Sequence, residues 1–274
     1  MTDGLEPLAK GGLTLLGCGK MGGAMLEGWL AAGLPPASVH VVEPHPSAQT
    51  DAFAARGVHV GLRPPAAAAA VVIAVKPQMM ADAAPAVAPL AGPSTLMLSI
   101  AAGTPIALFE SLFGATTPVV RAMPNTPAAV GRGVSALVAN GPGQAFLPLA
   151  EALLAAVGET VRLSREDQID AVTAVSGSGP AYVFHLIEAL AAAGAAEGLP
   201  ADLAMRLARA TVCGAGELAH RSGDDAATLR RNVTSPGGTT AAALEVLMDA
   251  DSGLPPLMAR TVAAAAARSR ALAG

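Results

Sequence analysis

The chain has 274 residues, of which 52% are hydrophobic and 14% are charged, and its formal net charge at pH 7 is −4. It carries no basic run that would suit a nucleic acid, and its longest apolar run, residues 66–75, is far shorter than the ~20 residues of a membrane span. No secretory signal is visible, and two cysteines are too few for a disulfide framework, so we expect a cytoplasmic protein. Its length suits two domains, and we expect neither nucleic-acid nor membrane partners.

Short β-branched runs alternate with alanine-rich helical stretches in the first half of the chain. This alternation predicts an α/β domain with a mostly parallel, doubly wound sheet and helices on both faces. We place this domain at residues 1–163. The expected strands are 13–16, 39–42, 58–60, 71–75, 95–100 and 119–122, with two further strands at 133–138 and 160–163 that close the sheet.

The pattern changes after residue 163, because no convincing strand follows. Long segments rich in alanine and leucine instead predict an all-α second domain at residues 164–274. The expected helices are 179–197, 201–220, 239–249 and 255 to the end.

A glycine-rich turn, Gly-Cys-Gly-Lys-Met-Gly, lies between the first expected strand and the following helix. In this context the G-x-G-x-x-G spacing indicates a Rossmann dinucleotide site. The first glycine permits the tight turn, the second lets the backbone approach a pyrophosphate, and the third lets the helix pack close to the strand. The alternative is an ordinary glycine turn. The predicted cofactor-binding residues here are Gly17, Cys18, Gly19, Lys20, Met21 and Gly22.

An acidic residue, Glu43, stands at the end of the second expected strand, about 20 residues further on, where a Rossmann domain binds the ribose hydroxyls. A carboxylate there would repel a 2′-phosphate, so the sequence leans toward NADH over NADPH. The alternative is that Glu43 points into solvent and that His45 or Arg63 offsets its charge.

Three further loops follow strands and should meet at the same edge of the sheet, where open parallel sheets bind ligands. They contain Lys76–Pro77, residues 99–103 and residues 121–127. The alternative for Lys76 is that it only places a charge in solvent at the end of the strand. Asn125 lies between two prolines, which would hold its amide in a fixed direction.

The helical half contains two glycine-rich turns, residues 176–180 and 235–240, each of which leads into a long helix. Such clusters are costly in a helical domain, because glycine loses more conformational freedom on folding than other residues. Two tight corners would explain them by packing alone. A helix N-terminus that offers backbone N–H groups to an anion explains them better, and a small carboxylate fits the second turn.

The motifs together resemble the pyrroline-5-carboxylate reductase family over nearly the whole chain after residue 12. They are Gly-Cys-Gly-Lys-Met-Gly (17–22), Ala-Val-Lys-Pro (74–77), Ser-Ile-Ala-Ala-Gly (99–103), Arg-Ala-Met-Pro-Asn-Thr-Pro (121–127), Val-Ser-Gly-Ser-Gly-Pro-Ala-Tyr (175–182) and Ser-Pro-Gly-Gly-Thr-Thr (235–240). The resemblance implies a Rossmann domain, a helical dimerisation domain, and dimers that often assemble into larger rings. It also implies hydride transfer from NADPH or NADH to the C=N bond of 1-pyrroline-5-carboxylate, which gives L-proline in the last step of proline biosynthesis.

The resemblance also assigns residues. Ser235 and the backbone N–H groups of Gly238 and Thr239 would hold the substrate carboxylate, and the catalytic Thr240 hydroxyl would reach the ring nitrogen. The predicted residues around the nicotinamide are Val75, Lys76, Pro77, Ala101, Ala102, Asn125 and Pro127.

The chain departs from the family at two places. Glu43 stands where the family often has a polar or small residue, and Arg231 follows Arg230 where the family often has an acidic residue.

Three alternative functions are weighed against the sequence. A β-hydroxyacid dehydrogenase would use a lysine of the helical domain, but no lysine follows Lys76. A reductase of another cyclic imino acid, such as pyrroline-2-carboxylate, would use the same turn. A non-catalytic NAD(P)-sensing protein would bind the cofactor without turnover. No His, Cys, Asp and Glu cluster has metal-ligand spacing, so we expect no metal.

Overall fold

The computed structural model describes residues 4–273 and divides the chain into two compact units. The first comprises the chain up to Gly177 together with the residues from Ala266 on, and the second comprises Ser178–Ala265. This division lies further along the chain than the expected boundary between 163 and 164. The reason is local packing, because Ile169 belongs to the hydrophobic core beneath the sheet of the first unit.

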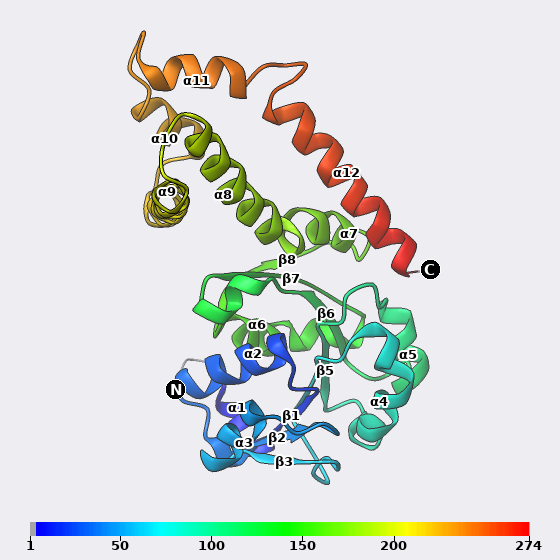
Figure 1. Ribbon diagram of the computed structural model, residues 1–274. Helices are drawn as coiled ribbons and strands as arrows, with labels where there is room; N and C mark the ends of the chain where they lie inside the picture. Colours follow the sequence, from blue (N-terminus) through cyan, green and yellow to red (C-terminus); the bar gives the residue numbers. More distant parts are fainter. Residues whose placement is uncertain (1–3, 274) are drawn as a thin grey trace. The chain divides into compact units, whose positions relative to one another are not determined.

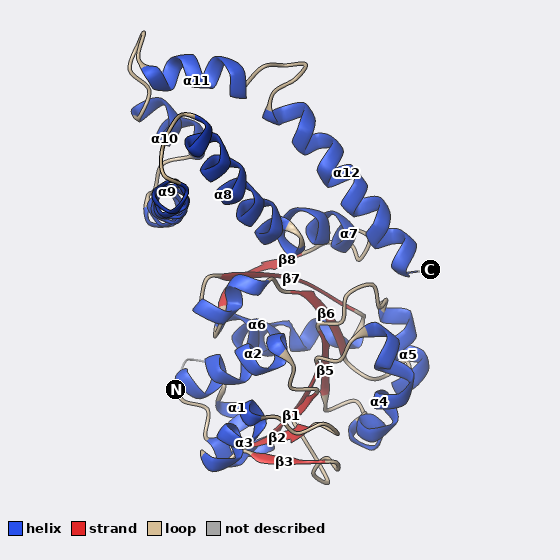
Figure 2. Ribbon diagram, in the orientation of Figure 1, coloured by secondary structure: helices blue, strands red, loops and turns tan. Residues whose placement is uncertain are grey.

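Within the described residues of the first unit, eight strands form one sheet (Figure 2). The strand order is β3-β2-β1-β4-β5-β6-β7-β8, and every neighbouring pair is parallel except β6 and β7. The predicted strands and the mostly parallel, doubly wound arrangement are confirmed. The strands are β1 Leu13–Leu16, β2 Val39–Val42, β3 His59–Gly61, β4 Ala70–Ile73, β5 Leu96–Ser99, β6 Val119–Met123, β7 Gly133–Ala139 and β8 Gly158–Arg162.

Helices cover both faces of this sheet, with α2 and α6 on one side and α4 and α5 on the other (Figure 1). The first unit's helices are α1 Glu6–Gly11, α2 Lys20–Ala31, α3 Ala48–Ala55, α4 Met80–Val87, α5 Ile106–Phe113, α6 Leu147–Ala155 and α7 Gln168–Val172. Short 3-10 segments are η1 Pro36–Ser38, η2 Pro77–Met79, η3 Ala88–Leu90, η4 Thr126–Val130 and η5 Pro142–Phe146, and one π-helical turn is η6 Thr173–Gly177.

The alternation of side chains along each strand decides which core they join. Leu13 and Leu15 of β1 enter the core with Trp29 of α2, whereas Leu16 enters the opposite core with Phe109 of α5. Trp29 is fully buried, and its indole N–H donates to the Leu153 carbonyl of α6 at 2.8 Å. The two cores hold the sheet rigidly and thereby fix the loops at its carboxyl edge.

The second unit consists of helices and loops in its described residues. α8 packs against α9, and Gly194 of α8 lies close enough that an added Cβ would be 3.5 Å from Cβ of Ala204. The predicted all-α second half is confirmed. Its helices are α8 Gly179–Ala196, α9 Ala201–Arg221, α10 Ala226–Asn232, α11 Thr239–Leu247 and the first part of α12 Leu254–Ala273.

The end of α12 belongs to the first unit. The Ser269 hydroxyl, buried at 6% exposure, donates to Oδ1 of Asp170 at 2.6 Å. A Cβ added at Gly103 would lie 3.4 Å from the Leu272 carbonyl oxygen. The last turns of the chain therefore pack beside the loop that follows β5.

None of the helices in the described part of the chain combines the length and apolar content that crossing a membrane would require.

Candidate functional site

The loop between β1 and α2 has the backbone geometry that its glycines predict. Gly17 adopts φ +86°, and a Cβ there would lie 2.8 Å from Cγ1 of Val75. A Cβ at Gly22 would lie 2.5 Å from the Gly17 carbonyl oxygen. Larger residues at these two positions would push α2 away from the strand, so both glycines are required for the close turn.

Gly19 differs from these two glycines, because a Cβ there would meet nothing within 4 Å. It is the N-cap of α2 and has no side-chain cap hydrogen bond. The first helical bond runs from the Gly23 N–H to the Gly19 carbonyl, so the N–H groups of the preceding turn have no acceptor within the helix. This open cradle at a helix N-terminus fits the pyrophosphate of a dinucleotide.

The Glu43 carboxylate faces this loop and does not lie free in solvent. Its Oε2 accepts the Cys18 N–H at 2.9 Å, and its Oε1 accepts the His45 N–H at 3.0 Å. The side chain is half-buried at the end of β2. A fixed negative charge therefore stands beside the loop that would bind the cofactor phosphates.

The Cys18 thiol is buried at 5% exposure, and burial together with the Glu43 charge raises its pKa to about 11. We expect iodoacetamide to alkylate Cys18 at pH 8 about a hundredfold more slowly than a small-molecule thiol, because only the thiolate reacts. Mass spectrometry of the Cys18 peptide measures this rate. Labelling as fast as that of the free thiol would contradict the burial.

The raised pKa of Cys18 also makes the stability of the folded protein depend on pH. The unfolded chain ionises this thiol near its ordinary pKa of 9.0, whereas the folded chain does so near 11. The stabilising contribution is therefore complete below about pH 9 and is lost as the pH rises toward 11.

A pocket of about 310 Å³ lies at the carboxyl ends of β4, β5 and β6. All three predicted strand-end loops contribute to it, and so does the first turn of α2. The predicted residues that line it are Met21, Val75, Lys76, Pro77, Ala101, Ala102 and Asn125. Pro127 lies in the neighbouring η4 segment and is not among the lining residues.

Sequence reasoning missed part of this lining, notably Gly177 from η6. Gly177 belongs to the 176–180 turn that the sequence placed in the helical domain. The glycine cluster was the available signal, but nothing local indicated which half of the chain it would contact. Ile100, Met123, Pro124 and Thr126 also line the pocket and belong to motifs that were recognised.

The second unit brings the four predicted substrate-binding residues into one tight turn at the start of α11. Gly237 adopts φ +70°, and Gly238 is the N-cap of α11 without a side-chain cap hydrogen bond. The Gly238 N–H donates to the Ser235 carbonyl at 3.0 Å. The Gly238 N–H therefore already has a partner, while the N–H groups of Thr239 and Thr240 precede the first helical bond of α11.

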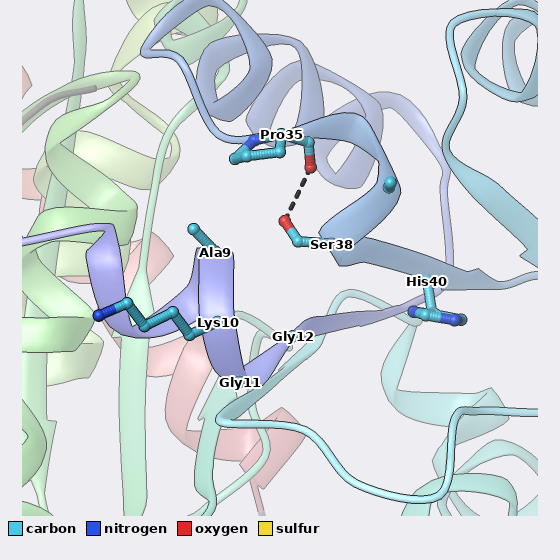
Figure 3. A pocket seen from close by; sticks show the side chains of 8 residues that line it. Ala9, Lys10, Gly11, Gly12, Pro35, Ser38 and His40 are labelled. Carbon is cyan, nitrogen blue, oxygen red and sulfur yellow. Dashed lines mark hydrogen bonds between the residues drawn. The ribbon is translucent and has the colours of Figure 1, made fainter.

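A second hollow of about 360 Å³ lies at the opposite ends of β1 and β2 (Figure 3). Lys10, Ser38 and His40 line it together with the Gly11–Gly12 turn. Its Ser38 hydroxyl donates to the Pro35 carbonyl at 2.7 Å.

The described residues include no group of three or more His, Cys, Asp or Glu that could hold a metal ion.

Residues 12–103 match the model described as "NADP oxidoreductase coenzyme F420-dependent", so the glycine cradle belongs to a Rossmann-fold oxidoreductase domain. Residues 166–272 match the model described as "Pyrroline-5-carboxylate reductase dimerisation". The chain is 42% identical over 265 residues to the pyrroline-5-carboxylate reductase of Pseudomonas aeruginosa, which covers 95% of this chain and 96% of that protein. The chain belongs to the pyrroline-5-carboxylate reductase family.

Other relatives agree with this assignment. The pyrroline-5-carboxylate reductase of Glycine max is 36% identical over 95% of both chains. The structure of a pyrroline-5-carboxylate reductase from Coxiella burnetii superposes with a TM-score of 0.89 at 34% identity, covering 96% of this chain and 99% of that one. The Plasmodium falciparum pyrroline carboxylate reductase with NADP bound superposes with a TM-score of 0.77 at 27% identity, covering 97% and 99%.

Proposed function

We propose that the chain reduces the C=N bond of 1-pyrroline-5-carboxylate to give L-proline, with NADH or NADPH as the reductant. The observation that carries this proposal is the cradle at Gly19, which is open to a pyrophosphate and leads to a pocket at the strand ends. When bound, the reduced nicotinamide supplies the hydride. The chain's residues bind and orient the reactants and exclude water.

We assign the substrate carboxylate to the turn at the start of α11. Ser235 is exposed, and the Thr239 N–H precedes the first helical bond of α11, at the end of the helix where the helix dipole favours an anion. The Gly238 N–H would have to share or release its bond to the Ser235 carbonyl. The half-buried Thr240 hydroxyl would donate to the ring nitrogen and help deliver its proton.

Thr240→Ala should lower kcat by about tenfold, because the ring nitrogen loses its donor. Thr240→Ser should recover most of the activity, and Ser235→Ala should raise KM for the substrate with little change in kcat. Thr234→Ala is the matched control, since the Thr234 hydroxyl donates to the Arg230 carbonyl at 2.6 Å. Steady-state kinetics measure all four variants. Wild-type kcat in Thr240→Ala would remove this residue from the mechanism.

We propose a preference for NADH, which rests on the fixed Glu43 carboxylate beside the phosphate loop. Glu43→Gln keeps an oxygen that can accept the Cys18 N–H but removes the charge that repels a 2′-phosphate. We expect the ratio of kcat/KM for NADH to that for NADPH to fall about tenfold. Glu27→Gln is the control, because Glu27 is an exposed carboxylate paired with Arg56 on the surface. An unchanged ratio in Glu43→Gln would assign the preference elsewhere.

We propose that two copies associate through the second unit in the cytoplasm, with larger rings of such dimers as a further step. The second unit of a single chain exposes many large apolar side chains, which soluble proteins usually cover. They include Val183, Phe184, Leu186, Leu190, Leu207, Leu218, Val246 and Leu247. Light scattering measures the assembly, and a monomer at micromolar concentration would contradict it.

A substrate panel tests the assignment against its alternatives. Pyrroline-5-carboxylate, pyrroline-2-carboxylate and the six-membered cyclic imino acid would be compared by kcat/KM. We expect the first to be used best. A higher value for another ring would reassign the substrate, and cofactor binding without turnover of any of them would indicate a sensing role.

A further inference from the structure

The π-helical turn η6 forms part of the wall of the pocket at the strand ends. It joins α7 to the segment before α8, and its last residue, Gly177, lines the pocket. Single π-helical turns occur frequently at functional sites, because they cost helix stability and persist where their shape is needed. This turn therefore has a geometry that something in the surrounding structure must hold.

Gly177 lies very close to the end of β6. A Cβ added at Gly177 would be 2.7 Å from Cε of Met123, which also lines the pocket. The backbone of the turn therefore rests against the Met123 side chain. Any outward movement of η6 would widen the pocket on this side, and any added atom would push Met123.

One side chain, Asn125, links this turn to the sheet. Its Oδ1 accepts the Val134 N–H of β7 at 2.9 Å, and its Nδ2 donates to the Ser176 carbonyl of η6 at 3.2 Å. Asn125 is the N-cap residue of η4 but makes no side-chain cap hydrogen bond there. The amide is buried at 9% exposure and bridges two elements instead of capping its own.

We propose that Asn125 is a positioning residue that sets the width of the nicotinamide pocket by holding η6 through the Ser176 carbonyl. This inference rests on the proposed function for the identity of the bound ring. A ring held loosely by a widened pocket reaches the reactive orientation less often, and small displacements of a reacting group reduce rates strongly. The sequence assigned Asn125 to the cofactor directly, whereas its amide contacts assign it a role through η6.

The variant Asn125→Asp separates the two arms of the amide. It keeps an oxygen that accepts the Val134 N–H, but it replaces the donor toward Ser176 with a second acceptor, which repels the carbonyl. We expect kcat to fall about tenfold. Affinity for NADH should fall relative to affinity for ADP-ribose, which lacks the nicotinamide, and ADP-ribose affinity should stay within about twofold of wild type.

A further variant alters the same wall from its Met123 side, and a second variant serves as its control. Gly177→Ala places a Cβ against Met123 and should reproduce the change in the ratio of NADH to ADP-ribose affinity. Ser176→Ala is the matched control, because it removes only the hydroxyl bond to Val172 and leaves the carbonyl in place. Combined with Asn125→Asp, Gly177→Ala should have less than its separate effect, since both variants alter one wall.

The ratio of NADH affinity to ADP-ribose affinity tests this inference independently of turnover. An unchanged ratio in both Asn125→Asp and Gly177→Ala would overturn it, provided that both variants unfold at the wild-type urea midpoint, and so would an equal loss of NADH and ADP-ribose affinity in such folded variants. If Asn125→Asp folds poorly, the ratio measured for Gly177→Ala alone decides. A wild-type protein that binds NADH but reduces no cyclic imine would refute the proposed function, while the ratio would still test the positioning role.

Discussion

Replacing Gly19 by alanine should weaken NADH and NADPH binding about a hundredfold, which corresponds to about 2.7 kcal/mol, without lowering the stability of the protein. The protein itself leaves open space around this position, since a Cβ would meet nothing within 4 Å. The backbone, with φ −73° and ψ −164°, suits alanine as well as glycine. The added methyl group would instead occupy the space in which the pyrophosphate approaches the helix N-terminus.

Two neighbouring glycines serve as controls for this prediction. Gly22→Ala should lose both affinity and stability, because its Cβ would lie 2.5 Å from a backbone oxygen. Gly23→Ala should retain affinity within a few-fold, because the three atoms nearest to its added Cβ all belong to the exposed side chain of Gln49, which can move. Isothermal titration and urea unfolding measure the two quantities. Wild-type affinity in Gly19→Ala would contradict the assignment of this loop to the cofactor phosphates.

The second large effect concerns the ion pair between Arg121 and Glu166. Arg121 of β6 donates to Oε1 of Glu166 at 2.6 Å, and the Arg121 side chain is only 6% exposed. The same Oε1 also accepts the Ile106 N–H at the start of α5, at 2.8 Å. Glu166→Ala should therefore lower the free energy of unfolding by about 3 kcal/mol, because it leaves a buried charge and a helix N–H without their partner.

The surface pair of Arg56 and Glu27 provides the comparison. Their side chains are 43% and 58% exposed, so Glu27→Ala should cost less than about 1 kcal/mol. Urea midpoints at one fixed protein concentration measure both variants, since subunit association also contributes to stability. Equal midpoints for the two variants would show that burial does not distinguish the pairs.

The central strands β1, β4 and β5 of the first unit were predictable because they are short segments that are buried along their whole length. β4 is buried along its whole length, and the sequence places it within two residues of its observed end. The antiparallel direction of β7 had a signal as well. Only the short segment between Met123 and Gly133 joins it to β6, whereas a parallel connection needs about a dozen residues or more.

The boundary between the two units was less accessible. The sequence placed it where the strand pattern stops, but α7 and η6 belong to the first unit, as does the chain from Ala266 on. Local periodicity reports which residues form a helix and not which core the helix joins. The bond between Ser269 and Asp170 joins residues far apart in the sequence, and neither residue type signals it.

The candidate site was likewise predictable only in part. Glycine spacing and the ends of parallel strands predicted the loop at Gly17 and most of the pocket lining, because both follow from backbone rules. Side-chain partners from distant parts of the chain could not be predicted in this way. The contacts of Glu43 with Cys18 and of Asn125 with Ser176 depend on the approach of separate loops, which local patterns do not encode.

The most direct test of the account is a proline assay. Purified protein would be mixed with pyrroline-5-carboxylate and either NADH or NADPH, with nicotinamide absorbance and proline followed together and Gly19→Ala run in parallel. We predict that one proline forms for each cofactor oxidised, with faster use of NADH, and that Gly19→Ala is nearly inactive at low cofactor concentration. Cofactor binding without proline formation would contradict the central claim.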